Sequence, residues 1–276
     1  MRRKCENLPI YLALTVIGAT TIFPLLWMVF TSLKPPETDV SNLRELFRFT
    51  FDFSNYRKVL VEGNLLRSFL NSLFVTLSVT GGKVFTSSLA AYAFARMRFF
   101  GRDQIFLGYL MTLMIPSTVT MIPLFLILRS FGWVNSYAAL IAPGLFSAYG
   151  TFLLRQFFLS LPRDLEEAAM LDGCGHWGIY WNVILPLSRN SLLTLAILTY
   201  MGSWRSLMWP LIVAHSTKLF TMPVALSKFN EMSTGGHVEW TLLMAGSVIM
   251  VIPMLLIFLF GQKFMMRGLL IGAVKG

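Results

Sequence analysis

The segment 161–187, LPRDLEEAAMLDGCGHWGIYWNVILPL, contains the side chains of this sequence that are best suited to charge recognition. Pro162 fits the first turn of a helix, and Gly173 ends that helix, because glycine tolerates the left-handed backbone that follows many helix C-termini. Three acids favour the positive N-terminal end of this helix: Asp164, Glu166 and Glu167. Carboxylates on a short exposed helix can form charge-assisted hydrogen bonds with basic side chains of another protein. We therefore predict that this segment recognises a basic partner.

A second short helix follows in the same segment. Its apolar and aromatic residues recur at i, i+3, i+4 and i+7 and so share one face: Trp177, Tyr180, Trp181 and Ile184. Pro186 is expected to end this helix before the next apolar run. Between residues 155 and 190 acids outnumber bases, although the whole chain has a net charge of +10. The pattern predicts a helix-turn-helix elbow, residues 161–187, with an acidic first half and an apolar second half.

Two cations lie inside otherwise apolar stretches, where a charge is costly unless it faces a cavity or reaches an interface. They are Lys83 and Arg205, the latter within the sequence GSWRSLMWP. Two interpretations of Arg205 stay open: it faces a polar or anionic solute along a pathway, or it packs near the membrane surface against Trp209. The candidate pathway residues are Lys83, Tyr200, Trp204, Arg205 and Trp209.

Metal and nucleotide chemistry have no clear basis in the sequence. The three histidines lack metal-ligand spacing: His176, His215 and His237. No G-x-x-x-x-G-K-[ST] pattern occurs, and Gly81-Gly82-Lys83 lacks both its spacing and its hydroxyl. We expect no metal, no cofactor and no bound nucleotide in this chain.

Six apolar runs could each cross a membrane, since an α-helix needs about 20 residues to do so. They lie near 10–31, 72–95, 105–128, 137–157, 190–213 and 240–261. With 55% hydrophobic residues, 13% charged residues and a mean hydropathy of +0.66, the chain is too apolar for a soluble domain of its length. We predict an all-α membrane protein with six transmembrane helices in a single domain, 1–276, whose first run is retained rather than cleaved. Pro116 and Pro123 predict kinks in the third run.

Lys and Arg are more numerous in the segments that lie inside when the N-terminus is cytoplasmic. This bias predicts cytoplasmic N- and C-termini and a cytoplasmic elbow. The cytoplasmic segments rich in Lys and Arg then face anionic membrane lipid, and this explains the basic net charge without a nucleic-acid partner. Cys5 and Cys174 both fall on the cytoplasmic side and far apart in sequence, which argues against a disulfide.

Residues 32–67 are the only sizeable outer loop in this prediction. Phe49, Phe51 and Phe53 alternate with polar residues and predict an extended segment, whereas 55–61 predicts a short amphipathic helix. Either the aromatic residues form an interfacial belt, or they contact an external partner. The sequence leaves both interpretations open.

The elbow resembles the "EAA" loop of ABC importer permeases. In that family the pattern is EAA, three residues, Gly, nine residues, then I-x-L-P. Here the matching residues are Glu167-Ala168-Ala169, Gly173 and Val183-Ile184-Leu185-Pro186, with Val183 in place of Ile. The pair Asp172-Gly173 and the C-terminal residues 267–276 also resemble sugar-importer permeases, so the likeness covers essentially the whole chain. Arg205 departs from it, because Asn usually follows that tryptophan.

The resemblance implies a permease of the carbohydrate, maltose- or glycerol-phosphate-like group, in a bacterial or archaeal cytoplasmic membrane. It implies that these residues couple the chain to an ATPase: Glu166, Glu167, Ala168, Ala169, Asp172, Gly173, Leu185 and Pro186. The implied partners are a second permease subunit, related or identical, two ATPase subunits that bind ATP and magnesium, and an extracytoplasmic solute-binding protein. The permease itself is then not an enzyme.

Two other functions remain as alternatives. A secondary, ion-coupled transporter usually relies on intramembrane carboxylates, and the six runs contain no Asp or Glu, although backbone carbonyls could still bind sodium. A membrane-embedded enzyme needs a clustered nucleophile, base or metal site near an interface, and the sequence shows none. Copurification of a stoichiometric ATPase would favour the permease over both. The sequence does not identify the solute.

Overall fold

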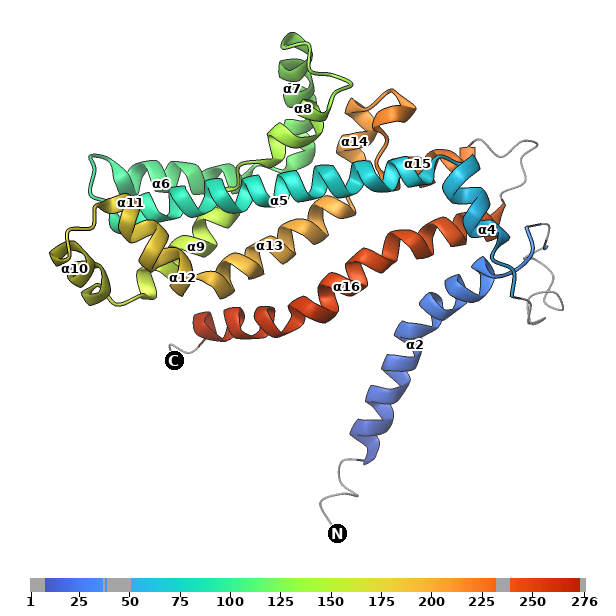
Figure 1. Cartoon of the computed structure of the whole chain (residues 1–276), viewed down its shortest axis with the longest axis horizontal. Coiled ribbons are helices and arrows are strands. Elements are labelled where there is room, and N and C mark those ends of the chain that lie inside the picture. Colours follow the sequence, from blue (N-terminus) through green and yellow to red (C-terminus); the bar gives the residue numbers. More distant parts are fainter. Residues whose placement is uncertain (1–7, 37, 39–50, 232–238, 274–276) are drawn as a thin grey trace. The chain divides into compact units, whose positions relative to one another are not determined.

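The structure is a computed structural model that describes residues 8–36, 38, 51–231 and 239–273, and every regular element within these ranges is a helix (Figure 1). The all-α prediction is therefore confirmed. The chain divides into two compact units: Met1–Phe69 with Met222–Pro253, and Leu70–Thr221 with Met254–Gly276. The two units are described separately below.

The first unit contains the long apolar helix α2 (Leu8–Ser32), α4 (Ser54–Arg57), the π-helical turn η1 (Lys58–Glu62), α15 (Met222–Glu231) and the first part of α16 (Trp240–Ala273). Its core is formed by Val59, Leu65, Met222, Leu226, Leu242 and Ala245. The buried side chain of Asn55 donates hydrogen bonds to the carbonyls of Ser32 and Lys34 at 2.9 and 2.5 Å, which joins the end of α2 to α4. The helix predicted over 55–61 is confirmed. Phe51 and Phe53 are exposed, and Phe49 lies outside the described residues.

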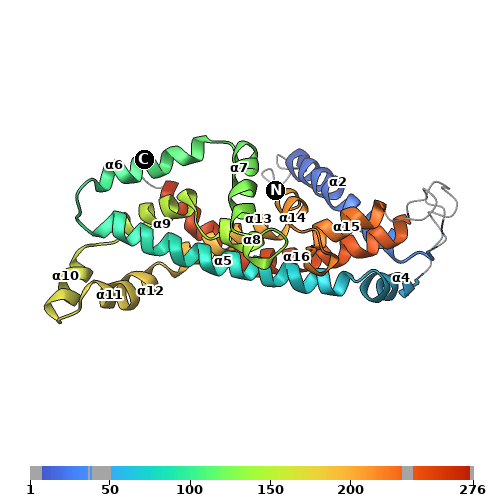
Figure 2. The same ribbon diagram turned by 90° about the horizontal axis from the view of Figure 1, so that it is seen from above.

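The second unit is organised around α5 (Leu65–Arg96), whose first residues belong to the first unit. The elements before the elbow are α6 (Arg102–Met111), η2 (Thr112–Met114), α7 (Ser117–Ser130), α8 (Tyr137–Ile141), η3 (Ala142–Gly144) and α9 (Ala148–Ser160). The elbow contains α10 (Asp164–Leu171), α11 (His176–Ile179), η4 (Tyr180–Ile184) and α12 (Leu185–Leu187). After it come α13 (Arg189–Trp204), α14 (Met208–Val213) and η5 (Thr217–Leu219). Figure 2 shows the elbow helices near the C-terminal end of α5.

Among the described residues, four helical segments are long and apolar enough to cross a membrane: Ile10–Ser32, Leu65–Arg96, Tyr137–Ser160 and Trp240–Lys263. Two bent pairs could each form one broken span. Arg102–Met114 and Ser117–Ser130 meet at 102°, and His176–Leu187 and Arg189–Trp204 meet at 76°. The number of candidate spans is therefore four to six. The first pair corresponds to the predicted run 105–128, whereas the predicted run 190–213 shares only α13 with the second pair, because His176–Leu187 belongs to the elbow.

The break in the third predicted run falls at Pro116, as predicted. Ile115 has extended backbone angles, φ −84° and ψ 117°, because a proline disfavours the helical conformation in the residue before it. The second predicted kink is different, since Pro123 lies within the regular helix α7.

The prediction of one continuous run over 190–213 is wrong. Helix α13 ends at Trp204, and α14 begins at Met208. Pro210 explains the break, because a proline in a helix interior lacks the N–H donor and its ring clashes with the carbonyl four residues earlier. In the first turn of a new helix this cost disappears. Arg205 therefore caps the C-terminal end of α13, in the break between α13 and α14.

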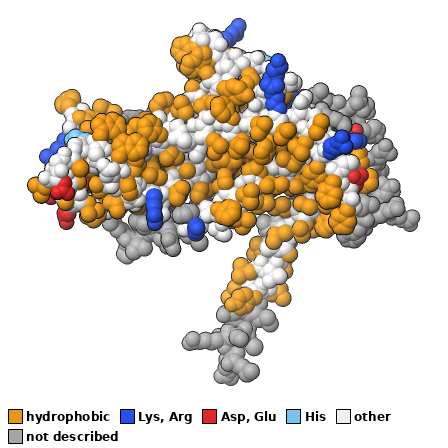
Figure 3. Space-filling model, viewed as in Figure 1, with side chains coloured by type: hydrophobic (Ala, Val, Ile, Leu, Met, Phe, Trp, Pro, Cys, Tyr) orange, Lys and Arg blue, Asp and Glu red, His pale blue; other side chains and the backbone are white. Residues whose placement is uncertain are grey.

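The main core of the second unit brings α5, α9, the elbow and α13 together through Ala91, Tyr92, Ala95, Leu154, Phe158, Ile179, Tyr180, Ile184 and Leu195. Hydrophobic side chains also cover much of the face seen in Figure 3, as expected of a surface that contacts lipid. Red acidic side chains are visible over the α10 region of the same view. The elbow is thus anchored to the helices by apolar packing and presents most of its acidic side chains outward.

Candidate functional site

The first half of the elbow folds as its sequence predicts. Helix α10 begins after Pro162 with its acids in the first turn, and Gly173 follows it with a left-handed φ of +84°. The amide of Gly173 donates to the carbonyl of Met170 at 3.0 Å, and the amide of Cys174 donates to Ala169 at 2.9 Å. This pair of bonds is a Schellman motif, which satisfies the last carbonyls of the helix. The predicted role of Gly173 as a helix end is confirmed.

The two adjacent glutamates of α10 have different environments. Glu167 is exposed, whereas Glu166 is 7% exposed and its Oε1 lies 2.8 Å from Nε of Arg96. Burial raises the pKa of the Glu166 carboxyl above its ordinary value, and the nearby charges of Arg96, Arg163 and His176 oppose that rise. Glu166 is therefore engaged within the chain, and Glu167 is the glutamate that a partner can reach.

Arg96, at the last position of α5, was not singled out from the sequence, where it is only one of the cytoplasmic flanking charges. Its Nη2 donates hydrogen bonds to the carbonyls of Phe158 and Leu161 at 2.6 and 2.8 Å, at the C-terminal end of α9. Arg96 thus connects three elements: its own helix α5, the end of α9, and α10 through Glu166. The C-terminal end of a helix carries partial negative charge and stabilises a nearby cation, which explains the position of Arg96 beside the end of α9.

The second half of the elbow differs from the single apolar face predicted for it. Tyr180 and Ile184 are fully buried, and the Tyr180 hydroxyl lies 2.7 Å from the Ser88 hydroxyl of α5. Trp177 and Trp181 are instead 66% and 52% exposed, and their rings meet Tyr180 edge to face. The predicted apolar face is wide, and only the side that carries Tyr180 and Ile184 packs against the core. The exposed tryptophans extend the outer surface of the elbow.

The other elbow residues divide in the same way. Ala169 and Leu185 pack against the main core, whereas Ala168, Asp172 and Pro186 are exposed. Pro186 does not end the helix, which continues to Leu187. The π-helical turn η4 precedes Pro186 and shifts the hydrogen-bond pattern where its N–H is missing, so the chain can stay helical there.

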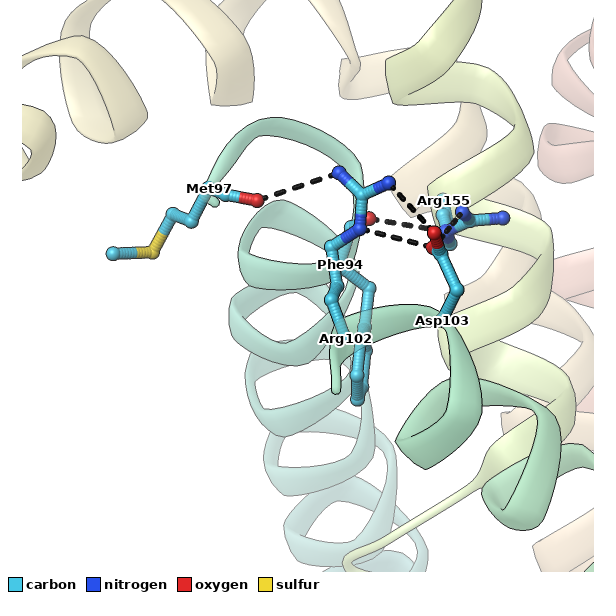
Figure 4. Close-up of polar contacts among 5 residues, drawn as sticks. All are labelled: Phe94, Met97, Arg102, Asp103 and Arg155. Atoms are coloured by element: carbon cyan, nitrogen blue, oxygen red, sulfur yellow. Dashed lines mark hydrogen bonds and ion pairs between the residues drawn. The ribbon is translucent and has the colours of Figure 1, made fainter. Parts of the chain in front are cut away.

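A second polar cluster lies where α5 turns into α6, beside α9 (Figure 4). Arg102 donates two hydrogen bonds to the carboxylate of Asp103, at 3.0 and 3.1 Å. Arg155 lies 3.7 Å from the same carboxylate, donates from Nε to the carbonyl of Phe94 at 3.2 Å, and stands 4.2 Å from the centre of the Phe106 ring. Arg155 thereby fixes the α5–α6 turn against α9.

A cavity of about 580 Å³ lies within the second unit, between α5, α7, α8, α9, α13 and α14. Of the five candidate pathway residues, Lys83 and Trp209 line it. Tyr200 and Trp204 are buried, and their rings stack at 5.7 Å on another side of α13. Arg205 is exposed and does not line the cavity. We call this space the Lys83 cavity.

Most polar side chains of the Lys83 cavity are hydroxyls that the sequence interpretation missed. They belong to Ser117, Thr120, Ser147, Tyr149, Thr199, Ser203 and Ser206. A signal for some of them was present, because Thr199, Ser203 and Ser206 recur at i, i+4 and i+7 and so form a polar stripe along an apolar run. Elsewhere in the described ranges, no group of three or more His, Cys, Asp or Glu side chains is placed to bind a metal ion.

Known proteins resemble this chain in sequence and in structure. The family model described as "Binding-protein-dependent transport system inner membrane component" matches residues 83–270, a stretch that includes Lys83 and the whole elbow. The arabinooligosaccharides transport system permease protein AraQ of Halalkalibacterium halodurans is 34% identical over 284 residues and is matched over 100% of both chains. The sn-glycerol-3-phosphate transport system permease protein UgpE of Yersinia enterocolitica is 33% identical over 72% of this chain and 70% of that protein.

One solved structure shares the fold. It is a crystal structure of a bacterial ABC transporter involved in the import of the acidic polysaccharide alginate, and one of its chains matches with a TM-score of 0.84. The match covers 94% of this chain and 96% of that chain at 22% sequence identity.

Proposed function

The chain belongs to the family of binding-protein-dependent transport system inner membrane components, and we propose that it forms part of the import pathway for a sugar, an oligosaccharide or a sugar-phosphate-like compound. It is a multi-pass inner membrane protein and the non-catalytic permease subunit of an ABC transporter. A periplasmic binding protein and ATPase subunits, which bind the ATP, complete that transporter. The solute class rests on similar permeases that are named for arabino-oligosaccharides and for sn-glycerol-3-phosphate.

The proposed assembly contains two permease subunits, alike or related, and two ATPase subunits that bind ATP with magnesium. This chain contributes one permease domain, with both termini and the elbow in the cytoplasm. The excess of Lys and Arg in the inner flanks supports that orientation. Because the chain has no phosphate-binding loop of its own, the energy of ATP enters through contact with the ATPase subunits.

The exposed side of α10 is the proposed contact with an ATPase subunit. The observation that supports this most directly is the contrast between the two glutamates: Arg96 engages Glu166 inside the chain, and Glu167 faces outward. A basic side chain of the ATPase would pair with Glu167. The buried contacts of Tyr180 and Arg96 then transmit movement of the elbow to α5 and α9, so that nucleotide binding shifts the population between inward- and outward-open states.

The proposal is tested by Glu167→Ala in the complete transporter, reconstituted in vesicles with its ATPase and binding protein. A charge-assisted hydrogen bond contributes about 1.5–3 kcal/mol, so we expect ATPase binding to weaken about tenfold or more and uptake to fall with it. Asn182→Ala is the control, since Asn182 is an exposed polar residue of the elbow that lies outside α10. Normal binding and uptake in Glu167→Ala would exclude this side of the elbow as the coupling contact.

A further inference from the structure

Among the described residues that line the Lys83 cavity, Lys83 is the only one with an acidic or basic side chain other than tyrosine. It lies near the midpoint of the 32-residue helix α5, and its neighbours in the cavity come from α7, α8, α9, α13 and α14 (Figure 1). We propose that this cavity binds an anionic saccharide, whose carboxylate or phosphate group pairs with the Lys83 ammonium. The inference rests on the proposed function and specifies the solute class of the same pathway.

The argument begins with the cost of the charge. An ammonium at membrane depth is unfavourable unless it faces a cavity or has a partner of opposite charge. Among the described residues, no acidic residue lines the cavity and Lys83 forms no ion pair. Its counter-charge must therefore come from outside the described residues, and the cavity is the space that the side chain lines.

The rest of the lining suits a saccharide. A volume of about 580 Å³ falls within the range of roughly 300–1,000 Å³ that small-molecule sites occupy. Seven lining residues have hydroxyl groups, and those of Tyr149, Ser203 and Ser206 make no hydrogen bond within the described ranges. The Trp209 ring is fixed by a hydrogen bond of 2.9 Å from its Nε1 to the carbonyl of Ala139. Free hydroxyls and a fixed aromatic face can bind the hydroxyls and the apolar face of a sugar ring.

A neutral sugar would use those hydroxyls but would leave the ammonium without a partner. An anionic sugar adds a charge-assisted hydrogen bond, which is roughly twice as strong as a neutral one. Its advantage grows in a site partly shielded from water, because the local dielectric is low. The chemistry of the lining therefore favours a saccharide with a carboxylate or phosphate group over a neutral one of similar size.

The test measures binding to the complete permease–ATPase complex in lipid nanodiscs, without the binding protein, whose own selectivity would otherwise decide the outcome. The probes for equilibrium dialysis are a galacturonic acid disaccharide, the matching neutral galactose disaccharide and sn-glycerol 3-phosphate. We expect at least one of the two anions to bind about tenfold more tightly than the neutral disaccharide. The anion with the higher affinity then distinguishes a carboxylate solute from a phosphate solute.

Three variants test whether a preference for anionic probes arises from the Lys83 cavity. Lys83→Met should abolish it, and Lys83→Arg should retain it, because the charge stays in place. Arg205→Met, which removes an exposed cation just beyond the lining residue Ser203, should also retain it. The inference is overturned if the unmodified complex binds none of the probes or shows no preference, if Lys83→Met keeps the preference, or if Arg205→Met loses it. ATP hydrolysis, measured on the same samples, distinguishes failure of the proposed function from failure of this inference. A permease that binds no active ATPase contradicts the proposed function. A complex that hydrolyses ATP but shows no preference for anions contradicts only this inference.

Discussion

Arg96 and Glu166 show how one buried ion pair can have opposing effects on a carboxylate. Burial favours the neutral acid, and the guanidinium at 2.8 Å favours the charged form. The direction of the pKa shift, upward, indicates that burial is the larger effect. A folded-state pKa above the unfolded value means that the folded protein binds this proton more tightly. The stability contribution of Glu166 is therefore greatest below pH 4.5 and is lost as the pH rises through the raised pKa.

Glu166→Gln tests that sign, because glutamine keeps the shape of the side chain and does not titrate. We expect the melting temperature of the variant, relative to the unmodified protein, to increase between about pH 4 and pH 8. The measurement is thermal unfolding in detergent at matched ionic strength, with Glu167→Gln, an exposed neighbour, as the control that should show a much smaller trend. A difference that decreased with pH would mean that Arg96 outweighs burial and lowers the pKa.

Gly173 has a conformational role rather than a packing one. Its φ is +84°, and a Cβ atom added there meets no atom within 4 Å. Gly173→Ala should therefore destabilise the end of α10 through the backbone alone, by about 1–2 kcal/mol, whereas Gly173→Asn should cost less because asparagine tolerates this conformation. Hydrogen exchange of the Cys174 amide reports that stability directly. Gly175→Ala is the matched control, since Gly175 also has open space but an ordinary φ of −77°. Equal protection in Gly173→Ala and Gly175→Ala would contradict this explanation.

The sequence predicted the elbow and its helix-ending glycine, and the resemblance singled out Glu167, but nothing in the sequence predicted that Glu166 is buried. Adjacent helical residues point about 100° apart, so their side chains can have different environments, and here one of them faces inward. Which one does so depends on Arg96, about seventy positions earlier in the chain. No local pattern contains that contact, because it arises only when α5, α9 and α10 pack together. The same reason explains why Tyr180, and not Trp177, became the buried aromatic residue.

For the helices and their breaks, the predictions were most accurate where a residue affects the backbone of its immediate neighbours. Pro116 marks a real break, because proline acts on the residue directly before it. Apolar content alone did not reveal the end of α13 at Trp204, since the residues up to Val213 are as apolar as those before. Nor does proline always break a helix in these runs: Pro123 stays inside α7. The polar stripe of Thr199, Ser203 and Ser206 is visible in the sequence, but only the packing of the facing helices shows that these hydroxyls line a cavity.

The contact between the α5–α6 turn and α9 predicts which of two substitutions, Arg155→Met or Asp103→Asn, lowers the melting temperature more. Arg155→Met removes a hydrogen bond to the Phe94 carbonyl and a contact with the Phe106 ring, each worth about 1 kcal/mol. Asp103→Asn removes the exposed ion pairs of that carboxylate with Arg102 and Arg155, and such surface pairs contribute about 0–1 kcal/mol each. We expect Arg155→Met to lower the melting temperature in detergent clearly more than Asp103→Asn does. The reverse order would show that the ion pairs, not the buried side of Arg155, hold this turn in place.

For the whole molecule, the remaining question is how many of the candidate spans cross the membrane. The four long helices suffice by length and composition, whereas the two bent pairs admit a second interpretation as re-entrant loops. The distribution of basic residues favours crossing. Arg98 and Arg102 lie just before the first pair, on the predicted cytoplasmic side, and the predicted cytoplasmic elbow lies just before α13. A helix pair bent by 102° still hides its backbone polar groups if the break is enclosed by protein, as a membrane requires.

Single-cysteine labelling decides between these interpretations. In a chain with Cys5 and Cys174 replaced by serine, cysteines are introduced at Arg98 and Ser130, on either side of the α6–α7 pair, and at Arg189 and Ser216, on either side of α13 and α14. If the α6–α7 pair and the segment from α13 to α14 both cross, an impermeant maleimide added to intact cells should label positions 130 and 216 and should reach positions 98 and 189 only after permeabilisation. A re-entrant α6–α7 pair would instead place positions 98 and 130 on the same side, and the same reasoning applies to positions 189 and 216. Because the N-terminus is predicted to be cytoplasmic, only the crossing of both segments, α6–α7 and α13–α14, places the elbow and the C-terminus on the predicted cytoplasmic side.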